Sequence, residues 1–170
     1  NDLTPVGSSS GKLNGTSGGR QVGASQTPGG PHAVLINGNA LGVVDLHNNN
    51  SYYYSMAMCG DDSQQGGWGY SRSGGIHALV WSGSSNSCVD LNPSGYNFSY
   101  CLGVHKGEQC GYAQNQSYFI TASHAMSWHG SATGCVDLHP VGWPYGYSRA
   151  TGCHDGEEVG YVSTLAYPDG

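Results

Sequence analysis

The sequence predicts an all-β protein, built as a propeller-like array of about four repeats that each hold four short strands in about 45 residues. Three observations support this prediction. Similar phrases recur along the chain, and the segments between them are short and bounded by Gly, Asn, Ser or Pro. No window places apolar residues at helical spacing over about ten positions.

The recurring phrases define the repeat. Asp-Leu begins at Asp2, Asp45, Asp90 and Asp137. His-Ala begins at His32, His77 and His124, and the residue four positions later is Ile36, Trp81 and Trp128 respectively. A third phrase reads RQVGAS (20–25), GGWGYS (66–71), EQCGYA (108–113) and EEVGYV (157–162). We therefore expect one domain, 1–170, of units spanning approximately 1–39, 40–84, 85–131 and 132–170, the last without a His-Ala strand.

The phrases also carry a family resemblance. HALVWSG (77–83), HAMSWHG (124–130), VDLNPSG (89–95) and VDLHPVG (136–142) resemble the HAF family of extracellular repeats, named for its His-Ala start. The resemblance implies an extracellular protein with propeller-like blades, and it implies location and architecture more than activity. A β-trefoil is the alternative fold, because three units of about 45 residues also suit it.

The repeated polar residues have two interpretations. WD-repeat propellers are similar in using a His, an Asp, a hydroxyl and a Trp as a structural network in each blade. By that analogy the network here comprises His32 with Asp45, His77 with Trp81 and Asp90, and His124 with Trp128 and Asp137. Alternatively, these residues line equivalent sugar pockets, in which Asp and His bind hydroxyl groups and Trp stacks on the ring.

Aromatic clusters follow three of the four Asp-Leu phrases. They are SYYYS (51–55), GYNFSY (95–100) and GWPYGY (142–147). Aromatic loops on a rigid β scaffold are typical recognition surfaces, although the same rings could pack between blades. The candidate ligand-binding residues are Tyr53, Tyr54, Tyr96, Phe98, Trp143 and Tyr145.

Six cysteines without a CxxC pair favour disulfides in an oxidising compartment over zinc. A register that pairs Val104 with Gly107 would set Cys101 opposite Cys110, so this is the expected disulfide. Cys88 and Cys135 occupy one column of the repeat, and the partners of Cys59 and Cys153 stay open. N-glycosylation sequons at Asn14, Asn49, Asn97 and Asn115 agree with an extracellular location, as does a first residue other than Met if a leader was removed.

Composition excludes several functions. The formal net charge is −6 with only five Lys and Arg, which argues against nucleic acid as a partner, and no stretch is apolar enough for a membrane span. No catalytic motif is present, and nothing selects a pair among Glu108, Glu157 and Glu158, so we expect no enzyme. No metal site or cofactor is expected; the loops DDSQQGG (61–67) and HDGEEVG (154–160) are at most weak calcium candidates.

The sequence therefore predicts a secreted, non-catalytic binding protein whose partner is carbohydrate or another extracellular glycoconjugate. The alternative is a self-assembling structural subunit of an extracellular filament or matrix. Three His-Ala strands for four Asp-Leu phrases leave one strand missing. Either the chain is a piece of a longer propeller, or the ring closes with an irregular last blade, or a neighbouring molecule pairs with the open strand edge.

Overall fold

The computed structural model describes residues 8–38, 41–115, 122–143 and 146–164. This part of the chain consists of β-strands and two single-turn 3-10 helices, which confirms the all-β prediction. No helix in it is long and apolar enough to cross a membrane.

The strands form four successive units, each an antiparallel meander. Unit 1 contains β1 (Gly11–Ser17), β2 (Arg20–Thr27), β3 (Gly30–Asn37) and β4 (Val43–Asp45). Unit 2 contains β5 (Tyr52–Gly60), β6 (Gln65–Ser71), β7 (Ile76–Trp81), η1 (Ser85–Ser87) and β8 (Val89–Asp90). Unit 3 contains β9 (Phe98–His105), β10 (Glu108–Gln114), β11 (Ser123–Trp128), η2 (Ala132–Gly134) and β12 (Val136–Asp137). Unit 4 contains the hairpin of β13 (Gly146–His154) and β14 (Glu157–Thr164).

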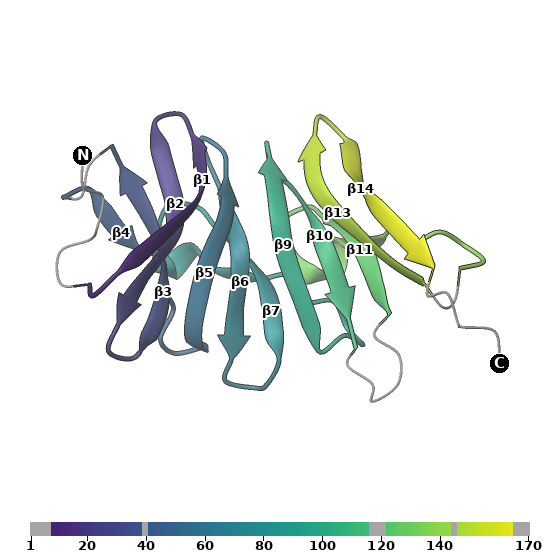
Figure 1. Ribbon diagram of the computed structural model, residues 1–170, viewed down its shortest axis with the longest axis horizontal. Helices are drawn as coiled ribbons and strands as arrows, with labels where there is room; N and C mark the ends of the chain where they lie inside the picture. The colour runs from purple at the N-terminus through teal and green to yellow at the C-terminus, as the bar shows by residue number, and fades with distance from the viewer. Residues whose placement is uncertain (1–7, 39–40, 116–121, 144–145, 165–170) are drawn as a thin grey trace.

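The units follow one another in chain order along the longest axis of the molecule (Figure 1). One parallel pairing, of Ile76 with Phe98, connects the sheets of units 2 and 3. The Asp-Leu phrases at Asp45, Asp90 and Asp137 each pair with the His-Ala strand before them, so these phrases end a unit and do not begin one. None of the sheets described closes on itself, and the propeller or trefoil arrangement stays a prediction.

A bulge recurs in the first strand of every unit. The extra residues are Asn14, Met58, Leu102 and Thr151. Next to each bulge the second strand carries a glycine, and these are Gly23, Gly67, Gly111 and Gly160. A Cβ at any of the four would overlap a carbonyl oxygen of the first strand, so the close approach of the two backbones requires glycine. Gly67, and not Gly69, is therefore the equivalent of Gly23, Gly111 and Gly160. The sequence alignment that placed GGWGYS with RQVGAS, EQCGYA and EEVGYV is wrong by two residues.

The hydrophobic core lies between successive units. One cluster joins Val22 and Leu35 of unit 1 to Leu79 and Trp81 of unit 2. A second cluster joins units 2 and 3, and a third joins units 3 and 4. Because the apolar residues of one sheet are buried against the next sheet, the stability of each unit depends on its neighbours.

Candidate functional site

Three histidine–aspartate pairs occupy the same place in units 1, 2 and 3. In each pair the histidine Nδ1 is hydrogen-bonded to an aspartate Oδ2, at 2.9 Å for His32–Asp45, 2.6 Å for His77–Asp90 and 2.7 Å for His124–Asp137. The structure thus brings each predicted pair together, with the histidine on the third strand of a unit and the aspartate on the fourth.

The aspartate also fixes the residue that follows the Asp-Leu phrase. Its Oδ1 accepts from the backbone N–H two residues later, at His47, Asn92 or His139, each at 2.8 Å. Burial opposes ionisation of Asp90, but hydrogen bonds from His77, Asn92 and Tyr52 together lower the pKa of its carboxyl. The carboxylate form is therefore the one that orders this turn.

A serine of the next unit completes each network. The side chains of His47, Asn92 and His139 are hydrogen-bonded to the hydroxyls of Ser55, Ser99 and Ser148, at 2.8, 2.7 and 2.8 Å. The same hydroxyls accept from the backbone N–H of Ala33, Ala78 and Ala125, at 3.1, 2.9 and 2.9 Å. We call these contacts the serine bridges. They connect the His-Ala strand of one unit to the first strand of the next, and all three serines are buried.

The two repeated tryptophans belong to the core. Trp81 and Trp128 are almost completely buried, and their side chains pack in two different hydrophobic clusters. Their indole N–H groups hydrogen-bond to neither residue of the His–Asp pairs. A buried ring cannot stack on a sugar, so the hypothesis that these tryptophans line ligand pockets is wrong.

A polar cavity of about 410 Å³ opens between the loop after β4 and unit 2. We call it the Arg72 pocket. It is lined by Asn48, Ser51, Tyr52, Ser71, Arg72, Ser73, Cys88 and Asp90. The Tyr52 hydroxyl donates to Asp90 Oδ2 at 3.0 Å, and Arg72 Nε donates to the Asn49 carbonyl at 2.9 Å. Both contacts fix groups that border the cavity.

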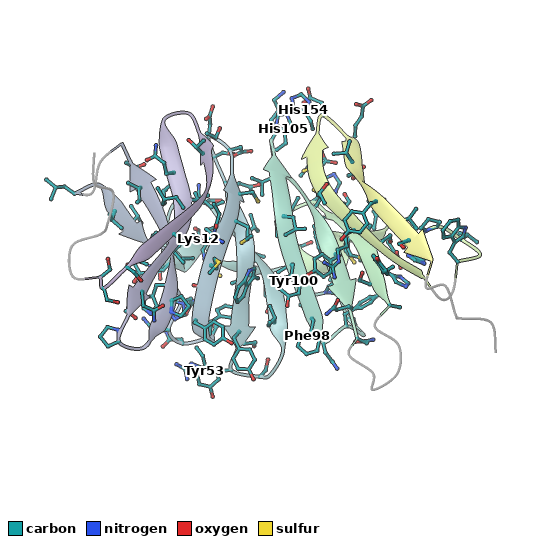
Figure 2. The ribbon with its side chains drawn as sticks, viewed as in Figure 1. Lys12, Tyr53, Phe98, Tyr100, His105 and His154 are labelled. Atoms are coloured by element: carbon teal, nitrogen blue, oxygen red, sulfur yellow. The ribbon has the colours of Figure 1, made fainter. Side chains whose placement is uncertain are left out.

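An exposed aromatic ring adjoins this pocket. The guanidinium of Arg72 lies over the ring of Tyr53, 4.4 Å from its centroid, and Tyr53 is 49% exposed. Tyr53 lies at one edge of the molecule, together with Phe98 (Figure 2). The cation–π attraction between the Arg72 guanidinium and the Tyr53 ring holds Arg72 in place beside the pocket.

Further rings continue from Tyr53 across units 2 and 3. Successive contacts join Tyr53 to Tyr70, Tyr54, Trp68, Tyr100 and Tyr112, with centroids 4.8–6.1 Å apart. We call this set the aromatic stripe. Arg149 of unit 4 lies over the last ring, 4.0 Å from its centroid. The sequence-based list of candidate residues did not include Trp68, Tyr70 and Tyr112, nor Tyr100 of the GYNFSY cluster. Tyr100 and Tyr112 are direct cross-strand partners.

The six predicted ligand-binding residues are not one cluster. Tyr53 and Tyr54 belong to the aromatic stripe. The Tyr96 hydroxyl lies 3.1 Å from His124 Nδ1, beside the His–Asp pair of unit 3, and Phe98 is half-buried at the start of β9. Trp143 is exposed, and its carbonyl lies 2.8 Å from His139 Nε2. Tyr145 lies outside the described residues.

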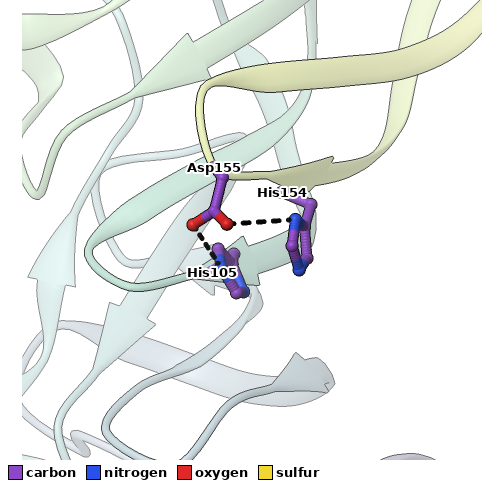
Figure 3. Close-up of side chains that lie close together, drawn as sticks. All are labelled: His105, His154 and Asp155. Atoms are coloured by element: carbon purple, nitrogen blue, oxygen red, sulfur yellow. Dashed lines mark hydrogen bonds and ion pairs between the residues drawn. The ribbon is translucent and has the colours of Figure 1, made fainter.

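A cluster of two histidines and an aspartate lies at the tips of two hairpins. His105 Nε2 and His154 Nδ1 are 3.0 Å and 3.6 Å from the oxygens of Asp155 (Figure 3). The imidazoles are stacked, with centroids 4.0 Å apart, so their in-plane lone pairs do not converge on one ion. Lys106 Nζ contacts Asp155 at 2.9 Å, and its hydrogen bond is the main cause of the lowered pKa of that carboxyl. We assign no metal to this arrangement.

The two weak calcium candidates form hairpin turns. In the segment 154–160, Asp155 and Gly156 have positive φ and form the two-residue turn between β13 and β14. In the segment 61–67, Asp61 Oδ1 accepts from the backbone N–H groups of Ser63 and Gln64, both at 2.7 Å. Asp61 therefore already has partners in its own turn, and Asp155 has partners in the turn between β9 and β10.

The cysteine register differs from the expected one. Cys101 lies opposite Gly111, and Cys110 lies opposite Gly103. The reason is a two-residue turn at Lys106 and Gly107, both with positive φ, which pairs His105 with Glu108, together with the bulge in β9. The assignment of Cys101 and Cys110 as directly opposed residues is therefore wrong. All six thiols are free in this structure.

The four sequon asparagines lie in different environments. Asn49, Asn97 and Asn115 are exposed, and Asn14 is half-buried. Asn115 Nδ2 donates to the Gly95 carbonyl at 2.7 Å, and Asn14 Nδ2 donates to the Ala57 carbonyl of unit 2 at 2.8 Å. A glycan on Asn14 would require this contact between units to break.

We compared the chain with models of protein families, with curated proteins and with solved structures, and none of the three comparisons found a match.

The buried imidazole of His47 predicts a pH dependence of stability. Burial, followed by the charge of His32, lowers the pKa of His47 from 6.5 to about 4. Between pH 6.5 and about 4, His47 is protonated in the unfolded chain and neutral in the folded chain. The free energy of unfolding therefore decreases as pH falls through this range. His47→Asn places there the residue that unit 2 uses at Asn92, and it should reduce this loss.

The measurement is the free energy of unfolding by denaturant at pH 7.5 and pH 5. We expect a smaller difference between the two pH values for His47→Asn than for the unchanged protein. His129→Asn, a change at an exposed histidine, is the matched control and should leave the difference as it was. An equal difference in all three proteins would contradict the prediction.

Proposed function

We propose that the protein is a secreted, non-catalytic binding protein that recognises carbohydrate at the Arg72 pocket, with Tyr53 as the stacking platform. The observation that carries this proposal is the position of an exposed aromatic ring beside a polar cavity. The cavity has the size of a small-ligand site, for which a typical volume is about 300–1,000 Å³.

The groups in the pocket suit sugar hydroxyls. The Asp90 side chain is 43% exposed, and each carboxylate oxygen can accept more than one hydrogen bond. Asn48 and the serine hydroxyls at 51, 71 and 73 can both donate and accept. A sugar presents many hydroxyls on its rim and apolar C–H groups on its face, so a polar wall beside a tyrosine ring matches both.

The contacts already present would preorganise this site. Asp90 is held by His77, Asn92 and Tyr52, and Arg72 is held by the Asn49 carbonyl and the Tyr53 ring. Groups fixed before binding lose little conformational entropy when the ligand arrives. The rest of the aromatic stripe would extend the contact surface for a longer glycan.

The setting of the site is part of the same proposal. We propose that the units are blades of a propeller, which agrees with three successive four-stranded meanders and with the resemblance to HAF repeats. Six cysteines and three exposed sequon asparagines favour an extracellular location.

Replacing the platform tests carbohydrate binding. A glycan array identifies a ligand, and titration calorimetry then measures its affinity. Tyr53→Ala should weaken binding about ten-fold or more, because the sugar loses the stacked ring. The matched control is Tyr161→Ala, which removes a ring that is 48% exposed on β14, away from the pocket. Equal affinity of both variants and the unchanged protein would contradict the proposed site.

Self-assembly is a second candidate function, and the surface of β14 favours it. Among the described residues β14 pairs only with β13, and it exposes Val159, Tyr161 and Val162. A strand at the edge of a sheet with exposed apolar side chains is a template for pairing with another chain. In this case the average mass in light scattering should rise with concentration, and Val159→Lys should prevent the rise. Val141→Lys, in an exposed loop, is the control; a constant mass over the dilution series would exclude this assembly.

A further inference from the structure

Four of the six cysteines meet in two pairs between units. Cys59 on β5 and Cys101 on β9 meet in the hydrophobic cluster between units 2 and 3. Cys110 on β10 and Cys153 on β13 meet in the cluster between units 3 and 4. Both pairs lie beside the bulge that recurs in each first strand.

Glycines make room for the sulfurs of both pairs. A Cβ on Gly66 would lie 2.7 Å from the Cys59 sulfur and 2.6 Å from the Cys101 sulfur, so the two sulfurs border one small space. A Cβ on Gly103 would lie 2.7 Å from the Cys110 sulfur and 3.3 Å from the Cys153 backbone nitrogen. Any larger side chain at either glycine would displace the sulfur from its partner.

We propose that Cys59–Cys101 and Cys110–Cys153 are oxidised to two disulfides that link units 2, 3 and 4 in series, while Cys88 and Cys135 stay as thiols. The inference is independent of carbohydrate binding. It assigns a modification site from the contacts between units, where the sequence had suggested a link within the β9–β10 hairpin.

The oxidant is a low-molecular-weight or protein disulfide, which the step consumes. For the second pair, the Cys153 thiolate attacks one sulfur of the oxidant, and a mixed disulfide forms while one thiolate leaves. The Cys110 thiolate then attacks the Cys153 sulfur and displaces the second thiolate. Two cysteine thiols lose two electrons and two protons, and the oxidant becomes two thiols.

The accessible member of each pair is suited to the first attack. Cys153 and Cys59 are half-buried, whereas Cys110 and Cys101 are completely buried. The neighbouring Cys110 thiol lowers the pKa of Cys153 and so favours its thiolate. The buried cysteine then resolves the mixed disulfide from its place in the core.

The two remaining cysteines pack in two different hydrophobic clusters. Cys88 packs with the cluster between units 1 and 2, and Cys135 packs with the cluster between units 2 and 3. Burial, followed by the charge of Asp90, raises the pKa of Cys88 to about 12. A thiol that is protonated at neutral pH is a poor nucleophile for exchange.

Peptide mapping of the full chain tests this assignment. The reduced protein is oxidised with glutathione disulfide, free thiols are alkylated in denaturant, and trypsin cleaves after Arg20, Arg72, Lys106 and Arg149. We expect peptide 21–72 linked to 73–106, and peptide 107–149 linked to 150–170. Fragmentation should locate the alkyl groups at Cys88 and Cys135.

The linked peptides together with the positions of the alkyl groups distinguish the outcomes, because 73–106 holds Cys88 and Cys101 and 107–149 holds Cys110 and Cys135. Any link between 73–106 and 107–149 would overturn the assignment, as would an alkyl group at Cys101 or Cys110 or an unchanged mass after oxidation. Cys153→Ser should abolish only the second link, and Cys101→Ser only the first. The matched controls Cys88→Ser and Cys135→Ser should retain both links, and loss of a link in either control would also contradict the proposal.

Discussion

The hydrogen bond between a serine hydroxyl and an alanine N–H of the preceding unit is the contact on which the succession of sheets depends. Each His-Ala strand pairs with a two- or three-residue Asp-Leu strand on one side, and the serine bridge reaches the alanine N–H from the next unit. A buried N–H without a partner would be costly, so each unit needs the serine of the following one. The bridge thus adds a directional contact to the apolar core between the units, and together they set how one sheet lies on the next.

The repeated phrase is explained by this requirement. Histidine orients aspartate, aspartate orders the turn, and the residue at the turn holds the serine of the next unit. The same geometry positions the candidate binding site, because Asp90 belongs both to the network of unit 2 and to the wall of the Arg72 pocket. The structural network and the proposed binding site therefore share one carboxylate, and the aromatic residues at the start of β5 border that site.

The strands and the His–Asp pairs could be predicted from the sequence, whereas the contacts between units could not, for physical reasons. Short strands and the His–Asp pairs follow from local patterns with constant spacing. The role of Ser55, Ser99 and Ser148 depends on contact with the sheet of the preceding unit. Serine is common in this chain, and the spacing of these serines from the Asp-Leu phrase varies, so no sequence pattern identifies them. The cysteine pairs and the stripe through Trp68 and Tyr100 join residues of different units, which only the packing of the sheets brings together. The bulges changed the register that a simple hairpin predicts.

Amide hydrogen exchange at Ala78 tests the serine bridge most directly. In the unchanged protein this N–H should exchange slowly, because Ser99 accepts from it in a buried place. Ser99→Ala should accelerate exchange at Ala78 and lower the free energy of unfolding by about 1–3 kcal/mol. Ser94→Ala, at an exposed position in the preceding turn, should change neither. Equal protection of Ala78 in Ser99→Ala and in the unchanged protein would contradict the account.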